Sequence, residues 1–193
     1  IYFMEQGESR NLSNSSFKDN NGINKSVAII DGGEDFVDGS WFFELTVKYT
    51  NNSRHILEQF KVAIVSEREI TDIVNEKFLP FSMNGLGLVQ RAHPEHLVDV
   101  GNAGDLHSGD VIGCGFSHID REWSVWFGIN GNYIRALCTP DCFRVLQPVI
   151  FLPRGIKVTP NFGYQSDFLF PLTSDIVGRK VDWKCMQTNP LQV

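Results

Sequence analysis

Apolar and polar residues alternate along several short stretches of the chain, most clearly between residues 109 and 137. In the middle of this stretch, one face receives the side chains of Trp123, Val125, Phe127 and Ile129. This period of two is typical of a half-buried β-strand. Asn130-Gly131 follows, and a type I′ turn favours this dipeptide because both of its central residues take a positive φ. The pattern therefore predicts a strand, a loop, a second strand, a tight turn and a third strand.

Similar patterns predict strands on both sides of this hairpin. Every second residue from Trp41 to Tyr49 is apolar and falls on one face, namely Trp41, Phe43, Leu45, Val47 and Tyr49. Further strands are expected at 26–30, 60–65, 79–89, 145–152 and 156–162. Pro160 lies in the last of these, so that part of the strand should lie where a missing N–H is tolerated. Residues 181–185 also alternate, which indicates either a late strand or the start of a further domain.

Three segments depart from the strand pattern. Residues 1–25 are expected to form a first short strand followed by loops, with a disordered tail as the alternative. Ser66 and Glu69 form a capping box, and apolar residues then recur at helical spacing as far as Phe78. We therefore expect a short helix at 66–78, inserted between strands. Residues 90–106 are mostly polar and are expected to form a loop.

Many short strands with frequent turns, one helix and no β-α-β rhythm indicate an all-β sandwich with a short helical insert. A length of 193 residues suits one domain that can bury a substantial core. We assign residues 26–171 to this domain. Residues 1–25 are assigned to an N-terminal extension of the same module, and residues 172–193 to a C-terminal extension.

Composition narrows the class of partner. The formal net charge is −6 and no Lys/Arg cluster appears, so a nucleic-acid partner is not expected. No apolar run approaches the roughly 20 residues that span a bilayer, so membrane insertion is not expected either. The four cysteines are irregularly spaced, which favours a reducing intracellular compartment, cytoplasmic or nuclear, with Cys114 in the core. Four N-x-S/T sequons leave secretion open.

The sequence lacks the common motifs of catalysis and metal binding, which favours a protein that is not an enzyme and binds no cofactor. The sequence contains no G-x-S-x-G, P-loop or H-E-x-x-H motif. His93 and His96 could ligate a metal ion together, but no further ligand accompanies them, so a polar loop is the simpler interpretation. Cys138 and Cys142 form a lone C-x3-C without a second pair. Asp110 stands just before a strand, where a carboxylate is expected to hydrogen-bond the loop backbone.

Five motifs in a fixed order resemble those of the SPRY domain, which is called B30.2-like when a PRY segment precedes it. They are Gly39–Leu45 (GSWFFEL), Gly109–Cys114 (GDVIGC), Val125–Gly131 (VWFGING), Gln147–Ile150 (QPVI) and Val158–Gly163 (VTPNFG). Each motif alone is weak, whereas five in order are specific. The chain departs from the family at Lys61–Val65, which lacks the family's Gly-Trp, and it contains no full PRY segment.

The resemblance implies a bent sandwich of two antiparallel sheets, the SPRY and concanavalin-like architecture, acting as a non-catalytic protein-interaction module. Loops at one end of such a sandwich capture a short segment of a partner protein, which is acidic for some family members. Such domains usually form one part of a larger protein. A rigid sandwich that holds variable loops in place allows specificity to change without refolding of the core.

The resemblance also places the candidate contact residues on loops. By position in the family, the partner-binding residues are Lys61, Pro80, Phe81, Arg91, Pro153 and Arg154. A cation beside an exposed aromatic ring can hold a carboxylate and an apolar side chain together. Ordinary surface remains the alternative for each residue, and core packing is the alternative for Phe81. Within 109–137, Trp126 is the one candidate contact residue, because it faces away from Phe127.

Two other classes of function remain open. A carbohydrate-binding sandwich would share the two-sheet architecture and would need exposed aromatic rings beside Asn or Asp. Trp126, Asn130 and Asn132 are a minimal version of such a set. A purely structural domain inside a large assembly is the second class. Binding to a glycan array would support the first class, and failure to capture any partner would support the second.

Overall fold

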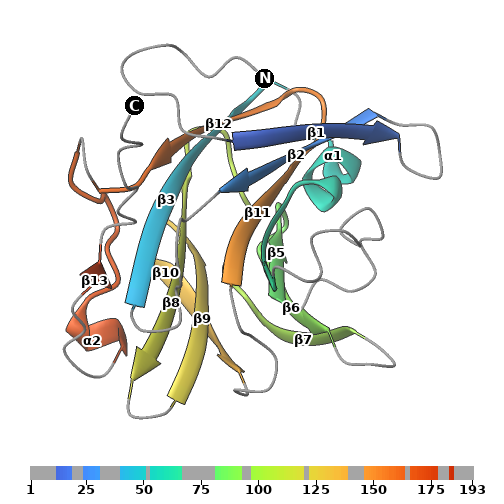
Figure 1. The fold of residues 1–193 in the computed structure, drawn as a ribbon. Coiled ribbons are helices and arrows are strands. Elements are labelled where there is room, and N and C mark those ends of the chain that lie inside the picture. Colours follow the sequence, from blue (N-terminus) through green and yellow to red (C-terminus); the bar gives the residue numbers. More distant parts are fainter. Residues whose placement is uncertain are drawn as a thin grey trace, which may run out of the picture.

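The computed structural model describes residues 12–18, 24–30, 40–50, 53–66, 81–92, 97–119, 122–138, 146–163, 166–177 and 183–184. Two β-sheets pack face to face, with two short helices beside them (Figure 1). The structure thus confirms the predicted all-β sandwich.

Within the described residues, the first sheet, sheet A, contains seven antiparallel strands. In spatial order they are β1 (Leu12–Lys18), β2 (Asn24–Ile30), β11 (Leu146–Leu152), β4 (Lys61–Ser66), β5 (Phe81–Asn84), β6 (Leu88–Ala92) and β7 (Leu97–Asn102). The end of β6 and all of β7 lie in residues 90–106, which corrects the predicted loop. Val98 and Val100 remain exposed on the edge strand β7, so this strand carries no strong apolar pattern.

The second sheet, sheet B, follows the order β10 (Asn132–Cys138), β9 (Glu122–Ile129), β8 (Val111–Ile119), β3 (Ser40–Tyr49) and β12 (Ile156–Asn161). These strands are antiparallel, and β13 (Trp183–Lys184) adds a short parallel pairing with the start of β3. Pro160 lies at the end of this order, in β12, where a missing N–H is tolerated. The predicted tight turn is confirmed, because φ is 49° at Asn130 and 84° at Gly131.

The helices described here are α1 (Arg54–Gln59) and α2 (Ser174–Val177). Helix α1 was not predicted, because its six residues bury Leu57 alone and show no helical period. The helix expected at 66–78 lies outside the described residues except for Ser66, which ends β4. Residues 1–11 also lie outside them, whereas β1 falls in the later part of residues 1–25, where the sequence predicted loops after a first short strand. None of the described helices is long and apolar enough to cross a bilayer.

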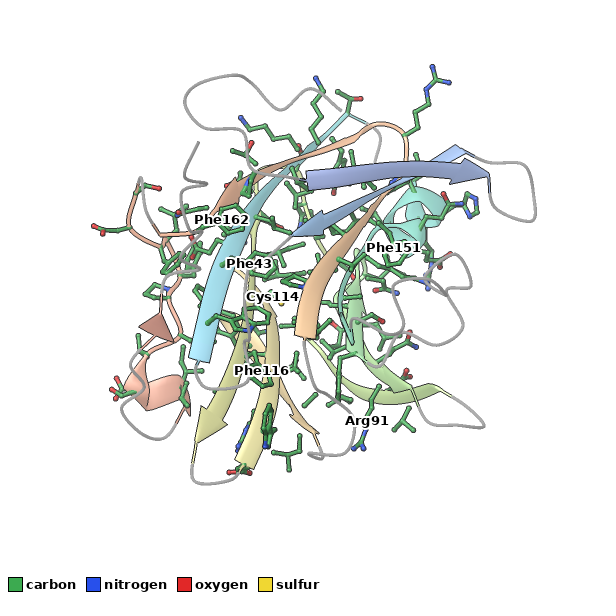
Figure 2. All side chains as sticks on the ribbon, in the orientation of Figure 1. Phe43, Arg91, Cys114, Phe116, Phe151 and Phe162 are labelled. Atoms are coloured by element: carbon green, nitrogen blue, oxygen red, sulfur yellow. The ribbon has the colours of Figure 1, made fainter. Side chains whose placement is uncertain are left out.

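Side chains from the facing sides of the two sheets form the core. The predicted inward faces of β3 and β9 are confirmed, since Trp41, Phe43, Leu45, Val47, Val125, Phe127 and Ile129 all belong to this core. Cys114 is buried as expected, and this burial raises the pKa of its thiol well above the usual 9.0. Figure 2 shows Phe43 and Cys114 between the sheets. Each fully buried phenylalanine stabilises the fold by about 2 kcal/mol relative to an exposed ring.

Residues 166–172 cross the outer face of sheet B, and we call them the strap. Leu172 is buried against Phe42 and Trp126, and the ring of Phe168 meets that of Phe42 edge to face at a centroid distance of 4.8 Å. The second face of β3 is therefore buried at Phe42 and Glu44, whereas Lys48, near the end of the strand, is exposed on it. Leu172, where the predicted C-terminal extension begins, packs on the domain.

Candidate functional site

Helix α1 and four of the described connections gather at one end of the sandwich, which we call the α1 end (Figure 1). The connections are the turn 85–87, the loop 103–110, the turn 130–131 and the turn 153–155. The strand register fixes which predicted residues reach this end. Lys61 begins β4 and lies opposite Asn84 and Phe151, whereas Arg91 lies opposite Phe81 at the other end of β5.

The structure does not bring Lys61 and Arg91 together. Their register positions are three residues apart along β5, a separation of roughly 10 Å. Val62 and Ile64 point into the core, so Lys61 points to the outer face of sheet A, while Arg91 shares the inner face with Phe81. Figure 2 shows Arg91 far from Phe151, the strand neighbour of Lys61.

Two of the predicted contact residues are buried, and for Phe81 this is the core packing that the sequence left as the alternative. Phe81 is 2% exposed and belongs to the core, and its ring lies 5.9 Å from the guanidinium carbon of Arg91. Pro153 is also buried, and its carbonyl accepts the N–H of Ile156 at 3.3 Å, which closes the turn before β12. Arg154 is exposed in that turn. Pro80 lies outside the described residues, as do His93, His96 and Cys142.

Trp126 is 4% exposed and is not a surface contact residue, which corrects a further prediction. Its indole N–H donates to Ser117 Oγ at 3.1 Å, and the guanidinium of Arg135 lies 5.5 Å from its ring centroid. Asn130 and Asn132 are also engaged, because their amides donate to Asp110 and to the carbonyl of Ala103. The minimal carbohydrate-binding set is therefore part of the scaffold.

A hollow of about 460 Å³ opens at the α1 end, between α1, the end of β3 and the loop 103–110. Four leucines form its apolar part, namely Leu57, Leu86, Leu88 and Leu106. The remaining lining residues are polar or charged: Tyr49, Arg54, Asn102, Asp105 and His107. With five polar or charged residues among nine, the lining is more polar than that of a typical small-molecule pocket.

The turn 85–87 forms one wall of the hollow and is tied to α1. The side-chain carbonyl of Asn84 accepts the N–H groups of Leu86 and Leu88 at 3.0 and 3.1 Å. The N–H of Gly85 donates to the carbonyl of Leu57 at 2.9 Å, so the end of α1 and the turn are joined directly. A Cβ at Gly85 would lie 2.6 Å from that carbonyl oxygen, so the approach requires glycine.

The loop 103–110 forms a second wall and is tied to the same turn. Ala103 and Leu106 donate their N–H groups to the carbonyls of Gly87 and Gly85, at 2.9 and 3.1 Å. The hydroxyl of Tyr49 donates to the carbonyl of Leu106 at 2.7 Å. Burial first and the charge of Asp110 second raise the pKa of this phenol above its usual 10.0.

Asp110 closes this loop, and its role was predicted correctly. Its carboxylate accepts the backbone N–H of His107 at 2.6 Å and the amide of Asn130 at 2.8 Å. Asn130 in turn accepts the N–H of Val111 at 2.9 Å. The tight turn of the central hairpin thus fixes the loop that lines the hollow.

The rim of the hollow carries both signs of charge. Arg54 is 81% exposed and pairs with Glu58 at 3.0 Å across one helical turn. His107 is 78% exposed, and Asp105 is exposed beside it. The described residues contain no group of three or more His, Cys, Asp or Glu side chains that could hold a metal ion. The geometry suits recognition of a mixed apolar and charged surface.

Sequence reasoning did not find this hollow. Its lining residues come from four separate segments, at 49, 54–57, 86–88 and 102–107, that meet only through tertiary contacts. A local signal was present nevertheless, in Asn84 with the Gly85-Leu86-Gly87 turn and in Asn102 with Gly104. Asn and Gly at such spacing are typical of turns held by side-chain to backbone hydrogen bonds, as Gly104 N–H to Asn102 Oδ1 at 2.7 Å shows.

Neither protein-family models nor curated proteins match this sequence. Among solved structures, the chain is similar to the SPRY domain of human HERC1, with 16% sequence identity and a TM-score of 0.49. That match covers 74% of this chain and 91% of the other. The chain is also similar to the carbohydrate binding module CBM66 from Bacillus subtilis, with 8% identity and a TM-score of 0.39 over 78% of this chain and 92% of the other.

Proposed function

We propose that this chain is a non-catalytic protein-interaction module that captures a short segment of a partner protein in the hollow at the α1 end. The hollow itself is the observation that carries the proposal. Its leucines can accept one apolar side chain, and its charged rim can select the neighbouring residues of the segment.

The rigidity of the loops supports this proposal. Hydrogen bonds join the two walls of the hollow to each other, the turn 85–87 to α1 and the loop 103–110 to the end of β3. A preformed surface loses little conformational freedom on binding, so a short segment can bind without ordering the loops. Loops held by a rigid scaffold are also where binding residues concentrate in proteins.

The five SPRY-like motifs support the same class of function from the sequence. In the structure, Asp110 and Asn130, which belong to two of these motifs, build the scaffold beneath the loop 103–110. The residues that line the hollow lie outside the motifs. The SPRY-like motifs thus support the site, while residues outside them form its surface. This division suits a module in which the same scaffold can carry sites for different partners.

Selection from a random peptide library displayed on phage tests the proposal. Wild-type protein should enrich peptides that share an apolar residue, and the Leu88→Gln, His107→Ala variant should bind the strongest of them at least tenfold more weakly. Leu88 and His107 line the hollow. Leu169→Gln is the matched control, because Leu169 is 66% exposed on the strap, away from the hollow. Equal affinity of the pocket variant and the control would overturn the proposal.

A further inference from the structure

Two lysines face each other directly beside the α1 end. Lys48 on β3 and Lys157 on β12 are register partners in an antiparallel pair, and both are exposed. Directly opposite residues in such a pair have Cα atoms about 5 Å apart and point to the same face. Arg154 adds a third exposed cation in the turn that leads into β12. We call Lys48 and Lys157 the basic pair.

The described part of the chain places no free carboxylate beside the basic pair. Glu44 and Asn161 lie four residues further along β3 and β12, roughly 13 Å away. Glu44 is occupied by the strap, and the carbonyl of Asp167 is held by Asn161 at that distant position. Asp110 lies nearer, but its carboxylate is bonded to His107 and Asn130. The lysines therefore repel each other in a protein whose net charge is −6.

The basic pair adjoins the hollow. Tyr49 follows Lys48 on β3 and lines the hollow, and its backbone N–H donates to Ser108 Oγ at 3.0 Å, next to His107. Since successive strand residues point to opposite faces, the hollow and the basic pair lie on the two sides of the end of β3. An extended segment that leaves the hollow past His107 would reach the lysines within a few residues.

We infer that the captured segment carries acidic side chains next to its apolar residue, and that their carboxylates bind between Lys48 and Lys157. This inference rests on the proposed function and names the partner chemistry that the function leaves open. A carboxylate placed between two lysines replaces their repulsion by two attractions and adds charge-assisted hydrogen bonds.

The stability of the unliganded protein tests the repulsion. Lys157→Glu creates an opposite-charge pair with Lys48, so its melting temperature should rise by about 1 to 3 °C. The Lys48→Glu, Lys157→Glu double variant restores a like-charge pair and should melt close to wild type. Calorimetry at low ionic strength measures both. A Lys157→Glu variant no more stable than wild type would overturn the inference, because no repulsion would then exist for a ligand to relieve.

Binding of the phage-selected peptide tests the recognition. The enriched peptides should contain an excess of Asp and Glu, and the strongest should bind Lys157→Glu roughly tenfold more weakly, with a reduced dependence on salt. Arg91→Glu is the charge-matched control at the opposite end of β5, and it should bind like wild type once circular dichroism confirms its fold.

The outcomes separate the two proposals. If the peptide needs Leu88 and His107 but binds Lys157→Glu and Arg91→Glu equally well, the acidic segment is wrong and capture in the hollow stands. If wild type enriches no peptide, or the peptide binds the pocket variant as tightly as wild type, both proposals fail. Loss of affinity in the pocket variant and in Lys157→Glu, with Arg91→Glu unchanged, supports both.

Discussion

The side chain of Glu44 holds the strap against the outer face of sheet B. It is 1% exposed on the outer face of β3, where the alternation of β3 alone would place a solvated carboxylate. Its two oxygens accept the consecutive N–H groups of Leu169 and Phe170 at 2.8 and 2.6 Å. The strap is therefore recognised by a buried carboxylate rather than by pairing as another strand, and Tyr133 completes the contact by donating to the carbonyl of Phe170.

Glu44→Gln should destabilise the protein by about 2 kcal/mol. The amide keeps one acceptor but turns an N–H₂ group toward a backbone donor, so one bond is lost, the other is no longer charge-assisted, and two donors face each other. Unfolding by urea measures the change. Asp167→Asn provides the control, because this exposed carboxylate lies on the same strap and should change stability by less than about 0.5 kcal/mol. Equal stability of both variants would show that Glu44 does not hold the strap.

At the scale of elements, alternation predicted the strands that bury one face and failed for elements that bury little. The strands β3, β8, β9 and β12 were all expected, because the sandwich core selects every second residue. The edge strand β7 and the short helix α1 were missed, because neither buries enough side chains to show a period. The binding residues were predicted least well. A phenylalanine such as Phe81 suits a core and a binding pocket equally well, so its residue type does not distinguish them. The separation of Lys61 from Arg91 depends on a strand register that no local pattern reveals.

Gly87→Ala tests the joint between the turn 85–87 and the loop 103–110. Gly87 has a φ of 70°, and a Cβ there would lie 1.9 Å from the carbonyl oxygen of Gly104, so the two walls of the hollow would separate. We expect a loss of about 3 kcal/mol or more in unfolding free energy and a loss of peptide binding. Gly155→Ala is the matched control. Its φ is 97° with no atom within 4 Å, so it should cost only about 1 kcal/mol. Similar costs for the two variants would contradict the steric argument.

At the scale of the whole molecule, the fold holds the thiol of Cys114 and the phenol of Tyr133 in their neutral forms. Burial raises the pKa of Cys114 well above 9.0, and burial followed by the charge of Glu44 raises that of Tyr133 far above its usual 10.0. In the unfolded chain both groups ionise near their ordinary values. The folded state therefore binds more protons than the unfolded state at alkaline pH, and its stability must fall as the pH rises.

The contribution of the Cys114 thiol to the unfolding free energy of the wild type should be constant below about pH 8.5. It should decrease above that pH. Each such group contributes a slope of up to about 1.4 kcal/mol per pH unit once the unfolded chain ionises, and the tyrosines add to it above about pH 10. Urea unfolding at several pH values between about 8 and 10 measures this slope. Cys114→Ala should be less stable at every pH but show a shallower slope, because no thiol remains to ionise. Val125→Ala removes a comparably buried, non-titrating group and should keep the wild-type slope. Parallel curves for wild type and Cys114→Ala would mean that the folded core loses the thiol proton as readily as the unfolded chain.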